Sequence, residues 1–111
     1  MSTNKIKTYS EFWPFYLKEH SQKATRTWHF YGSTIAFVFL VCFALTLNGY
    51  YILLALLSGY GFAWYSHFKI ERNRPATFTY PLWSLASDWR MWFMALTGRL
   101  DAELKKYQIP L

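Results

Sequence analysis

Three histidines and one glutamate are the residues in this sequence that could bind a metal ion. His67 and Glu71 are four residues apart, so on a helix their side chains lie about 40° apart and share one face. An imidazole and a carboxylate at this spacing can supply two ligands, or a ligand and its orienting partner, to a hard or borderline metal. The same pair also fits an ordinary helix end, where His67 binds a carbonyl or a lipid headgroup and Glu71 pairs with a neighbouring cation.

The two remaining histidines can be brought to the same place by a helical hairpin. Residues 27–68 contain no Lys, Arg, Asp or Glu, and His29 and His67 lie just inside the two ends of that stretch. In an antiparallel hairpin they would lie at the same depth. A break near residues 22–25 would let a preceding helix fold back and deliver His20. Three imidazoles and one carboxylate would then converge. The alternative is that His20 and His29 are separate residues of a membrane interface.

Other side chains are candidates for binding a substrate or orienting a ligand. Arg26 lies three residues before His29 and suits the carboxylate of a bound ligand, Glu71 or a lipid phosphate. Asp88, in an otherwise aromatic segment, could hold one tautomer of a histidine or pair with a neighbour such as Arg90. We therefore expect Arg26 near the site and Asp88 behind a histidine.

Aromatic residues continue the face that carries His67. Tyr60 and Trp64 precede it at helical spacing, and Arg74 follows at the expected level of the lipid headgroups. We expect Tyr60 and Trp64 to border a bound acyl chain, and Arg26 or Arg74 to meet its carboxylate.

Composition and hydropathy predict an all-α integral membrane protein with one domain. The chain has 111 residues, of which 53% are hydrophobic and 23% aromatic, and the uncharged stretch is long enough to cross a bilayer twice. The architecture we expect is a hairpin of two spanning helices with flanking interfacial helices. The expected elements are an interfacial helix at about 10–22, spanning helices at about 25–47 and 50–73, an interfacial or partly inserted helix at about 81–97, and a solvated tail at 99–111.

Local signals set the expected ends of these helices. Ser10 and Thr25 are the expected N-caps of the first two helices, and Asn48-Gly49 is the expected turn between the spanning helices. Pro75 limits the second spanning helix, because the residue before a proline is disfavoured in the helical region.

Charge distribution predicts the orientation and argues against other classes of protein. The net charge is +6, and every Lys and Arg lies outside the uncharged stretch, so the positive-inside bias places both termini in the cytoplasm. A basic rim beside a lipid-facing stretch fits anionic headgroups better than nucleic acid. The N-terminal region has no apolar block typical of a removable signal peptide, and the single cysteine, Cys42, forms no internal disulfide. Two spanning helices are few for enclosing a lipid, so a homo-oligomer is plausible.

Several blocks of the sequence resemble a known family. They are Phe15-Tyr16-Leu17-Lys18-Glu19-His20, His29-Phe30-Tyr31-Gly32, Gly59-Tyr60-Gly61-Phe62-Ala63-Trp64, and His67, Glu71 and Asn73-Arg74-Pro75-Ala76, followed by Thr77-Phe78-Thr79-Tyr80-Pro81 and Asp88. The chain resembles, to about Leu100, the small membrane family typified by the fungal 2-hydroxy fatty acid dioxygenase of phytosphingosine metabolism, and is similar to its compact bacterial branch.

The resemblance implies an all-helical membrane protein with an Fe(II) site built by histidines. Such an enzyme uses O2 to shorten a 2-hydroxy fatty acid by one carbon. By this interpretation His20, His29 and His67 bind the iron, with Glu71 as fourth ligand or orienter. Two other functions stay open from the residues alone. One is a b-type haem held by His29 and His67 for electron transfer. The other is a membrane scaffold or lipid-interaction protein without catalysis.

Overall fold

The structure is a computed structural model that describes residues 6–111. Within that range all of the regular structure is helical, as the sequence predicts. In chain order the elements are α1 (Tyr9–Lys18), α2 (Lys23–Thr46), α3 (Tyr50–Ser66), the π-helical turn η1 (His67–Glu71), the 3-10 turn η2 (Ala76–Phe78), α4 (Pro81–Leu96) and α5 (Leu100–Lys106).

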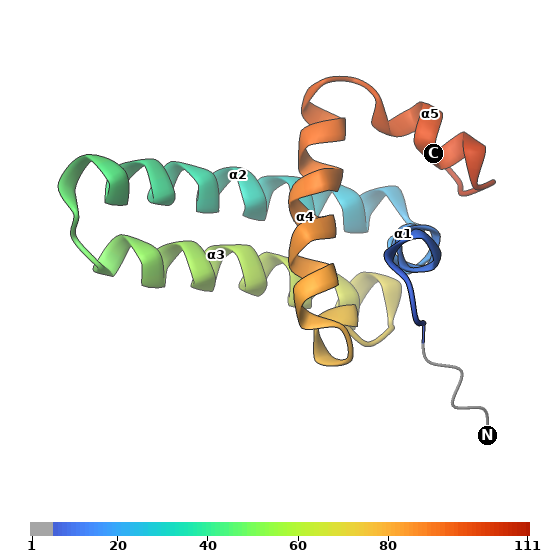
Figure 1. Cartoon of the computed structure of the whole chain (residues 1–111), viewed down its shortest axis with the longest axis horizontal. Coiled ribbons are helices and arrows are strands. Elements are labelled where there is room, and N and C mark those ends of the chain that lie inside the picture. The colour runs from blue at the N-terminus through green and yellow to red at the C-terminus, as the bar shows by residue number, and fades with distance from the viewer. Residues whose placement is uncertain (1–5) are drawn as a thin grey trace.

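Two long helices, α2 and α3, form an antiparallel hairpin (Figure 1). The turn lies where the sequence predicts it. Leu47 ends α2 in the left-handed region, at φ 57°, and the side chain of Asn48 accepts a hydrogen bond from the backbone of Tyr50 at 3.0 Å. The turn places the two helices side by side over their whole length, so His29 and His67 come to the same end of the hairpin.

The hairpin depends on a close approach at Gly32. A Cβ atom at this position would lie 2.6 Å from Cβ of Phe62 and 3.1 Å from the carbonyl oxygen of Ser58, both on α3. Only glycine leaves room for the backbones to pack at this distance. Next to it, Ala36 faces Gly59, so small side chains continue along the contact between the two helices.

The remaining helices pack at the open end of the hairpin and form the core there. In Figure 1, α4 crosses α2 and α3 close to that end, and α1 and α5 lie beside it. The buried side chains of this core come from α1, η2, α4, α5 and the residues that follow α5. They are Phe12, Trp13, Tyr16, Leu17, Ala76, Met91, Leu100, Leu104 and Ile109.

Both predicted N-caps were wrong. Thr8 rather than Ser10 caps α1, because its side chain accepts from the backbone N–H of Glu11 at 3.3 Å. Helix α2 begins two residues before Thr25, and Gln22, its N-cap residue, makes no capping bond with its own side chain. The carboxylate of Glu71 takes that role instead, because it accepts from the backbone N–H of Gln22 at 2.6 Å.

The predicted second spanning helix, residues 50–73, is not one uniform α-helix. The α-helix ends at Ser66 and widens into the π-helical turn η1, after which Arg72 adopts φ 61°. The backbone N–H of Asn73 then bonds back to the carbonyl of His67 at 2.9 Å. This wider turn directs the Asn73 side chain back towards His67, and π-helical turns of this kind occur often at functional sites.

The expected solvated tail at residues 99–111 is also not what the structure has. Leu100–Lys106 forms α5, and Leu100, Leu104 and Ile109 are buried in the core. These three apolar residues, four and five positions apart, are too few to reveal the buried face of a helix in the sequence. The segment is therefore part of the domain and covers α1 and α4.

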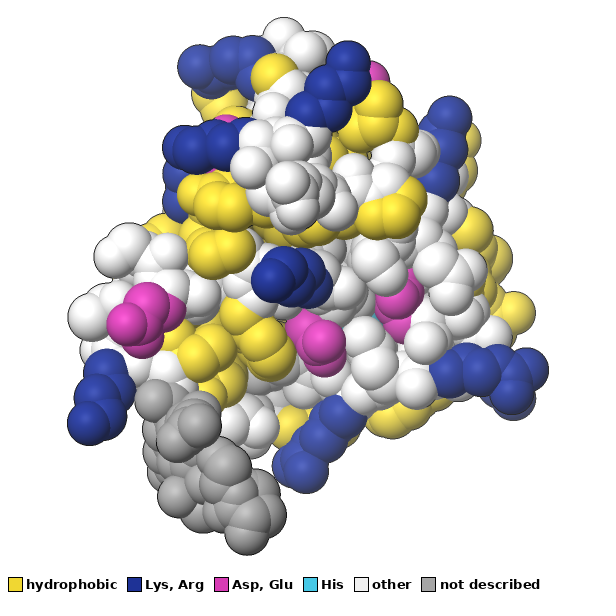
Figure 2. All heavy atoms as spheres, turned by 90° about the vertical axis from the view of Figure 1, so that its right-hand side faces the viewer, with side chains coloured by type: hydrophobic (Ala, Val, Ile, Leu, Met, Phe, Trp, Pro, Cys, Tyr) yellow, Lys and Arg dark blue, Asp and Glu magenta, His cyan; other side chains and the backbone are white. Residues whose placement is uncertain are grey.

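Apolar side chains remain exposed along the hairpin beyond the core. Leu45, Leu47 and Leu57 are 81%, 78% and 62% exposed. Within residues 6–111, one helix, α2, is long and apolar enough to cross a membrane, with a mean hydropathy of 1.7. Figure 2 shows the opposite end of the molecule, where Lys, Arg, Asp and Glu side chains gather. An apolar hairpin with a charged base is the polarity expected at a lipid surface.

The close contact at Gly32 gives a test of the hairpin. Gly32→Ala should lower the free energy of unfolding by about 1–3 kcal/mol, because the new methyl group overlaps Phe62. Gly61→Ala is the matched control on α3, since a Cβ there meets nothing within 4 Å and alanine favours the helix by about 0.5–1 kcal/mol. Thermal unfolding in detergent measures both. Equal effects of the two changes would contradict the packing described.

Candidate metal centre

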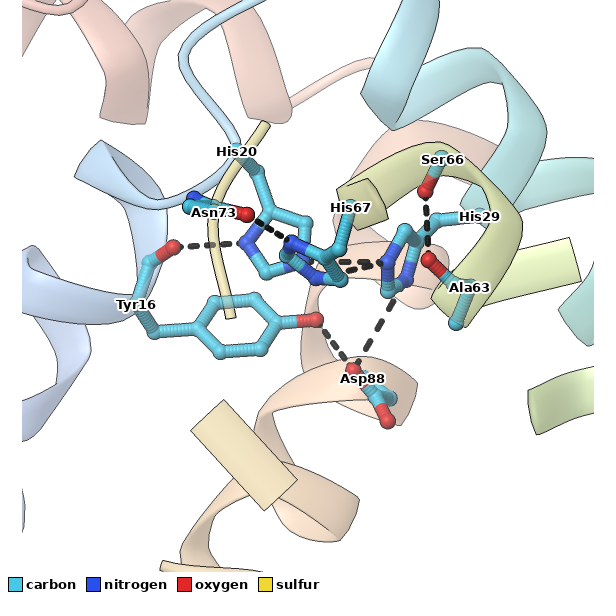
Figure 3. A network of polar contacts seen from close by, with 8 residues as sticks. All are labelled: Tyr16, His20, His29, Ala63, Ser66, His67, Asn73 and Asp88. Carbon is cyan, nitrogen blue, oxygen red and sulfur yellow. Dashed lines mark hydrogen bonds and ion pairs between the residues drawn. The ribbon is translucent and has the colours of Figure 1, made fainter. Parts of the chain in front are cut away.

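Three histidine side chains meet at the open end of the hairpin (Figure 3). The Nε2 atoms of His20 and His29 are 3.1 Å apart, those of His29 and His67 are 3.3 Å apart, and those of His67 and His20 are 3.0 Å apart. All three residues are buried, with at most 5% of their surface exposed. The hairpin and the folded-back α1 therefore bring together the three histidines that the sequence singles out.

Each histidine comes from a different element. His20 follows the end of α1, His29 lies in the second turn of α2, and His67 begins η1. Arg26 holds the loop that carries His20, because its guanidinium donates to the carbonyl of His20 at 2.7 Å and to that of Pro110 at 2.9 Å. The break between α1 and α2 is thus held in place by a buried arginine.

Acceptor atoms bond to Nδ1 of two of the three rings, and a carboxyl oxygen lies near Nδ1 of the third. Nδ1 of His20 lies 2.7 Å from the carbonyl oxygen of Tyr16, which can only accept, so this nitrogen carries the proton. Nδ1 of His67 lies 2.7 Å from Oδ1 of Asn73, whose NH2 group donates to the carbonyl of Glu19. Nδ1 of His29 faces Oδ1 of Asp88 at 3.8 Å. In the neutral rings each Nε2 atom therefore presents a lone pair.

Three lone pairs directed at one point repel one another unless a cation lies between them. Burial lowers the pKa of His20 well below its ordinary value, and the neighbouring His29 and His67 lower it further, so a proton does not satisfy this ring at neutral pH. A metal ion does, because neutral imidazole is the form that binds metals. The three histidines could therefore hold a metal ion.

The spacing of the nitrogen atoms agrees with coordination of one ion. For metal–nitrogen bonds of about 2.1 Å, ligands at right angles lie roughly 3.0 Å apart and tetrahedral ligands roughly 3.4 Å apart. The separations of 3.0–3.3 Å fall in this range. Three ligands on one side of an ion leave positions open for other molecules, as in catalytic sites.

The carboxyl group of Asp88 lies behind His29 and is itself controlled by Tyr16. The Tyr16 hydroxyl donates a short hydrogen bond to Oδ1 of Asp88. Burial raises the pKa of Asp88 to about 7, and the bond from Tyr16 opposes this rise. Burial and the nearby Asp88 also raise the pKa of Tyr16 well above its usual value, so the phenol stays protonated. The alternative pairing of Asp88 with Arg90 does not occur, because Arg90 lies 3.8 Å from Glu103.

Glu71 does not join the histidine cluster. One of its carboxylate oxygens accepts from Ser21, and the other accepts from the backbone of Gln22 and from Thr25 at 2.7 Å. A carboxylate is favourable at this place, because the start of α2 leaves backbone N–H groups unpaired. Among the described residues, the group that could hold a metal consists of the three histidines alone.

Of the two arginines expected at the substrate carboxylate, Arg26 lies near the histidines and lines a small cavity together with His29 and Asp88, whereas Arg74 lies at the surface. The guanidinium of Arg26 donates to the two backbone carbonyls named above. Arg74 is exposed, and its guanidinium lies 5.3 Å from the centre of the Phe78 ring. A second small cavity of about 10 Å³ is bordered by all three histidines, and no described Lys or Arg lines it.

Tyr60 and Trp64 do lie beside the histidines. Trp64 borders the small cavity, and Tyr60 lines a larger one of about 180 Å³ that begins at His29 and Asp88. The larger cavity runs between α2, α3 and α4 as far as Leu40 and Ile52. Its lining is mostly apolar, and small residues such as Ala36 and Gly59 make the space.

Two orienting residues were missed in the sequence. Tyr16 precedes His20 by four residues, and its carbonyl is free to meet the ring because α1 ends at Lys18 and the backbone N–H of His20 bonds to Leu17. Asn73 lies six residues after His67, and its contact arises only because η1 is a π-helical turn followed by the left-handed Arg72. No spacing rule for an α-helix brings these two residues together.

The geometry disfavours the haem alternative. Axial histidines lie on opposite faces of a porphyrin, so their Nε2 atoms would be about 4 Å apart with the macrocycle between them. The Nε2 atoms of His29 and His67 are 3.3 Å apart, and the cavity between the histidines has only about 10 Å³.

Comparison with known proteins identifies the family. Residues 6–100 match the family described as 2-hydroxy-palmitic acid dioxygenase Mpo1-like. The chain belongs to this family. No curated protein and no solved structure matches it. The resemblance suspected from the sequence is thereby confirmed, and the matched segment contains all three histidines together with Tyr16, Asn73 and Asp88.

Metal retention tests the donor set. Replacing His20, His29 or His67 with alanine should reduce bound metal from about one ion per chain to background, because two remaining imidazoles hold an ion far more weakly. Elemental analysis of the purified variants measures this. Glu71→Gln is the control and should retain the metal, since its carboxylate contacts the start of α2. Loss of metal in Glu71→Gln, with an unchanged melting temperature, would make Glu71 a ligand.

Proposed function

We propose that the protein is a membrane-embedded, Fe(II)-dependent dioxygenase that shortens 2-hydroxy fatty acids by one carbon. The observation that carries the proposal is the convergence of three buried Nε2 lone pairs in a chain of the Mpo1-like family. A scaffold or lipid-interaction protein does not require three buried imidazoles, whose lone pairs repel one another in the absence of an ion.

The overall reaction needs no reductant besides the substrate. The hydroxy acid, R–CH(OH)–COOH, and O2 give the shorter acid R–COOH, CO2 and water. The bond between the carboxyl carbon and the hydroxyl-bearing carbon breaks, the two carbons together lose four electrons, and O2 takes up all four. Iron is suited to this chemistry because a site with open positions next to three histidines can activate O2 and orient a hydroxy acid.

The protein's own contribution is to bind and orient the substrate. The 180 Å³ cavity begins at His29 and extends to Leu40, eleven residues further along α2 and therefore roughly 16 Å away. This is about half of a hydrocarbon core of ~30 Å, and so close to the length that one lipid acyl chain spans. An acyl chain in this cavity has its head beside the histidines, where Asp88 and Tyr16 hold the orientation of His29.

The membrane placement we propose follows from the same arrangement. Helix α2, and α3 continued by η1, cross the bilayer, and the charged base with the histidines lies at the headgroup level. The basic residues at that base favour the cytoplasmic side for it and for both termini. A substrate acid dissolved in the membrane can then enter the cavity from the lipid.

Activity with purified protein tests the reaction. Fe(II)-loaded protein should consume O2 with 2-hydroxypalmitate and release pentadecanoic acid, while palmitate should give no O2 uptake because it has no hydroxyl group to oxidise. An oxygen electrode and mass spectrometry of the products measure this. His67→Ala is the inactive control. Retained iron without O2 consumption or product would contradict the proposed reaction.

Chain-length preference tests the cavity. Ala55 is buried and lines the far part of the cavity, so Ala55→Phe should exclude the end of a long chain. Displacing about two methylenes at ~0.8 kcal/mol each corresponds to a fall in kcat/KM for 2-hydroxypalmitate of about tenfold or more. The value for 2-hydroxydecanoate should change little. Leu57→Phe, on the exposed side of α3, is the control. Equal losses for both acids would mean that the chain lies elsewhere.

A further inference from the structure

Two buried polar groups in the described part of the chain have no hydrogen-bond partner. They are Nε1 of Trp64, on α3, and Oγ of Ser84, on α4. Ser84 is only 2% exposed. Buried polar groups in proteins are almost always paired, because leaving one unpaired forfeits its bonds with water. Two such groups therefore need an explanation.

Both residues border the same small cavity, although they belong to different helices. Its wall also contains His20, His29 and His67. Elsewhere in this region the polar groups are paired: Tyr16 bonds to Asp88, Asn73 to His67, and Ser66 to a backbone carbonyl. The two residues with unpaired donors thus lie in the wall of the cavity that the three histidines border.

The chemistry of the two groups indicates what they bind. The indole N–H can only donate, and a serine hydroxyl donates equally well, so their partner is an acceptor oxygen. The cavity has about 10 Å³, which is room for one oxygen atom of a ligand and not for a chain. No described Lys or Arg lines it.

This small cavity adjoins the larger apolar one. The two share His29, Ala63 and Asp88 in their walls. A molecule whose chain lies between α2 and α3 therefore places its polar head beside Trp64 and Ser84. Only one end of a fatty acid, the carboxylate, has oxygen atoms. When ionised, these oxygen atoms accept hydrogen bonds and donate none.

We propose that Trp64 Nε1 and Ser84 Oγ donate hydrogen bonds to the carboxylate of the bound fatty acid. This inference rests on the proposed function and replaces Arg26 and Arg74 as the residues that bind the head of the substrate. The donors are uncharged, so the cation at the three histidines is the group that balances the charge of the carboxylate. The two residues are positioning residues, and they select an acid over an alcohol.

Ligand binding without turnover tests this subsite. Protein loaded with Co(II), under nitrogen, is titrated with palmitate, 2-hydroxypalmitate and 1,2-hexadecanediol, and the visible spectrum of the cobalt reports binding at the site. Trp64→Phe and Ser84→Ala should weaken binding of both acids about tenfold or more, because a hydrogen bond to a charged group is lost. Binding of the diol should change little.

Matched controls separate the subsite from general effects of substitution. Trp28→Phe changes a tryptophan that is 36% exposed, and Ser58→Ala changes a serine whose hydroxyl bonds to the carbonyl of Leu54. Neither lines either cavity, and both should bind like the wild type. The melting temperature of ligand-free Ser84→Ala should equal or exceed that of the wild type, because an unpaired buried hydroxyl is removed.

Each other outcome overturns the inference in a recognisable way. Unchanged affinity of both variants for the acids, with normal binding by the wild type, removes the subsite and leaves the proposed function intact. Equal weakening for the diol means that the donors bind a hydroxyl group rather than a carboxylate. A fall in melting temperature of Ser84→Ala together with lost binding assigns Ser84 to structure. Failure of the wild type to bind 2-hydroxypalmitate ends both proposals.

Discussion

The arrangement of this small protein depends on three imidazole lone pairs that face one another. Nδ1 of His20 and Nδ1 of His67 bond to acceptors from Tyr16 and Asn73, and Asp88 lies beside Nδ1 of His29, so the three Nε2 atoms face one another. Without a cation this arrangement is repulsive, and it is held by burial and by contacts that span the whole chain. Helix α1, the hairpin and α4 each supply one part of it.

The metal centre and the apolar hairpin are connected through helix packing. Gly32 allows α2 and α3 to approach closely near the histidines, while Ala36, Ala55 and Gly59 keep space open further along. Close contact at one level and open space at the next give a cavity that starts at the metal centre. The same small side chains thus support the fold and leave space for the proposed acyl chain.

The sequence predicted much of this arrangement because its strongest signals are local. The uncharged stretch, the Asn48-Gly49 turn and the three histidines define a hairpin with its chemistry at the open end. Long-range contacts override the local signals in several places. Glu71 lies on the expected helix but binds the start of α2, Arg26 binds the loop of His20, and the segment after Arg99 is buried against α1.

By itself, the sequence determined which residues could take part and in which elements, because helix periodicity, turn residues and the absence of charge act over a few neighbours. Only the tertiary structure decided the partner of each polar group. Hydrogen bonds of Asn73, Arg26 and Glu71 join residues 6 to 84 positions apart. Such pairings form only after the helices pack, since the loss of water on burial then makes an unpaired group unfavourable.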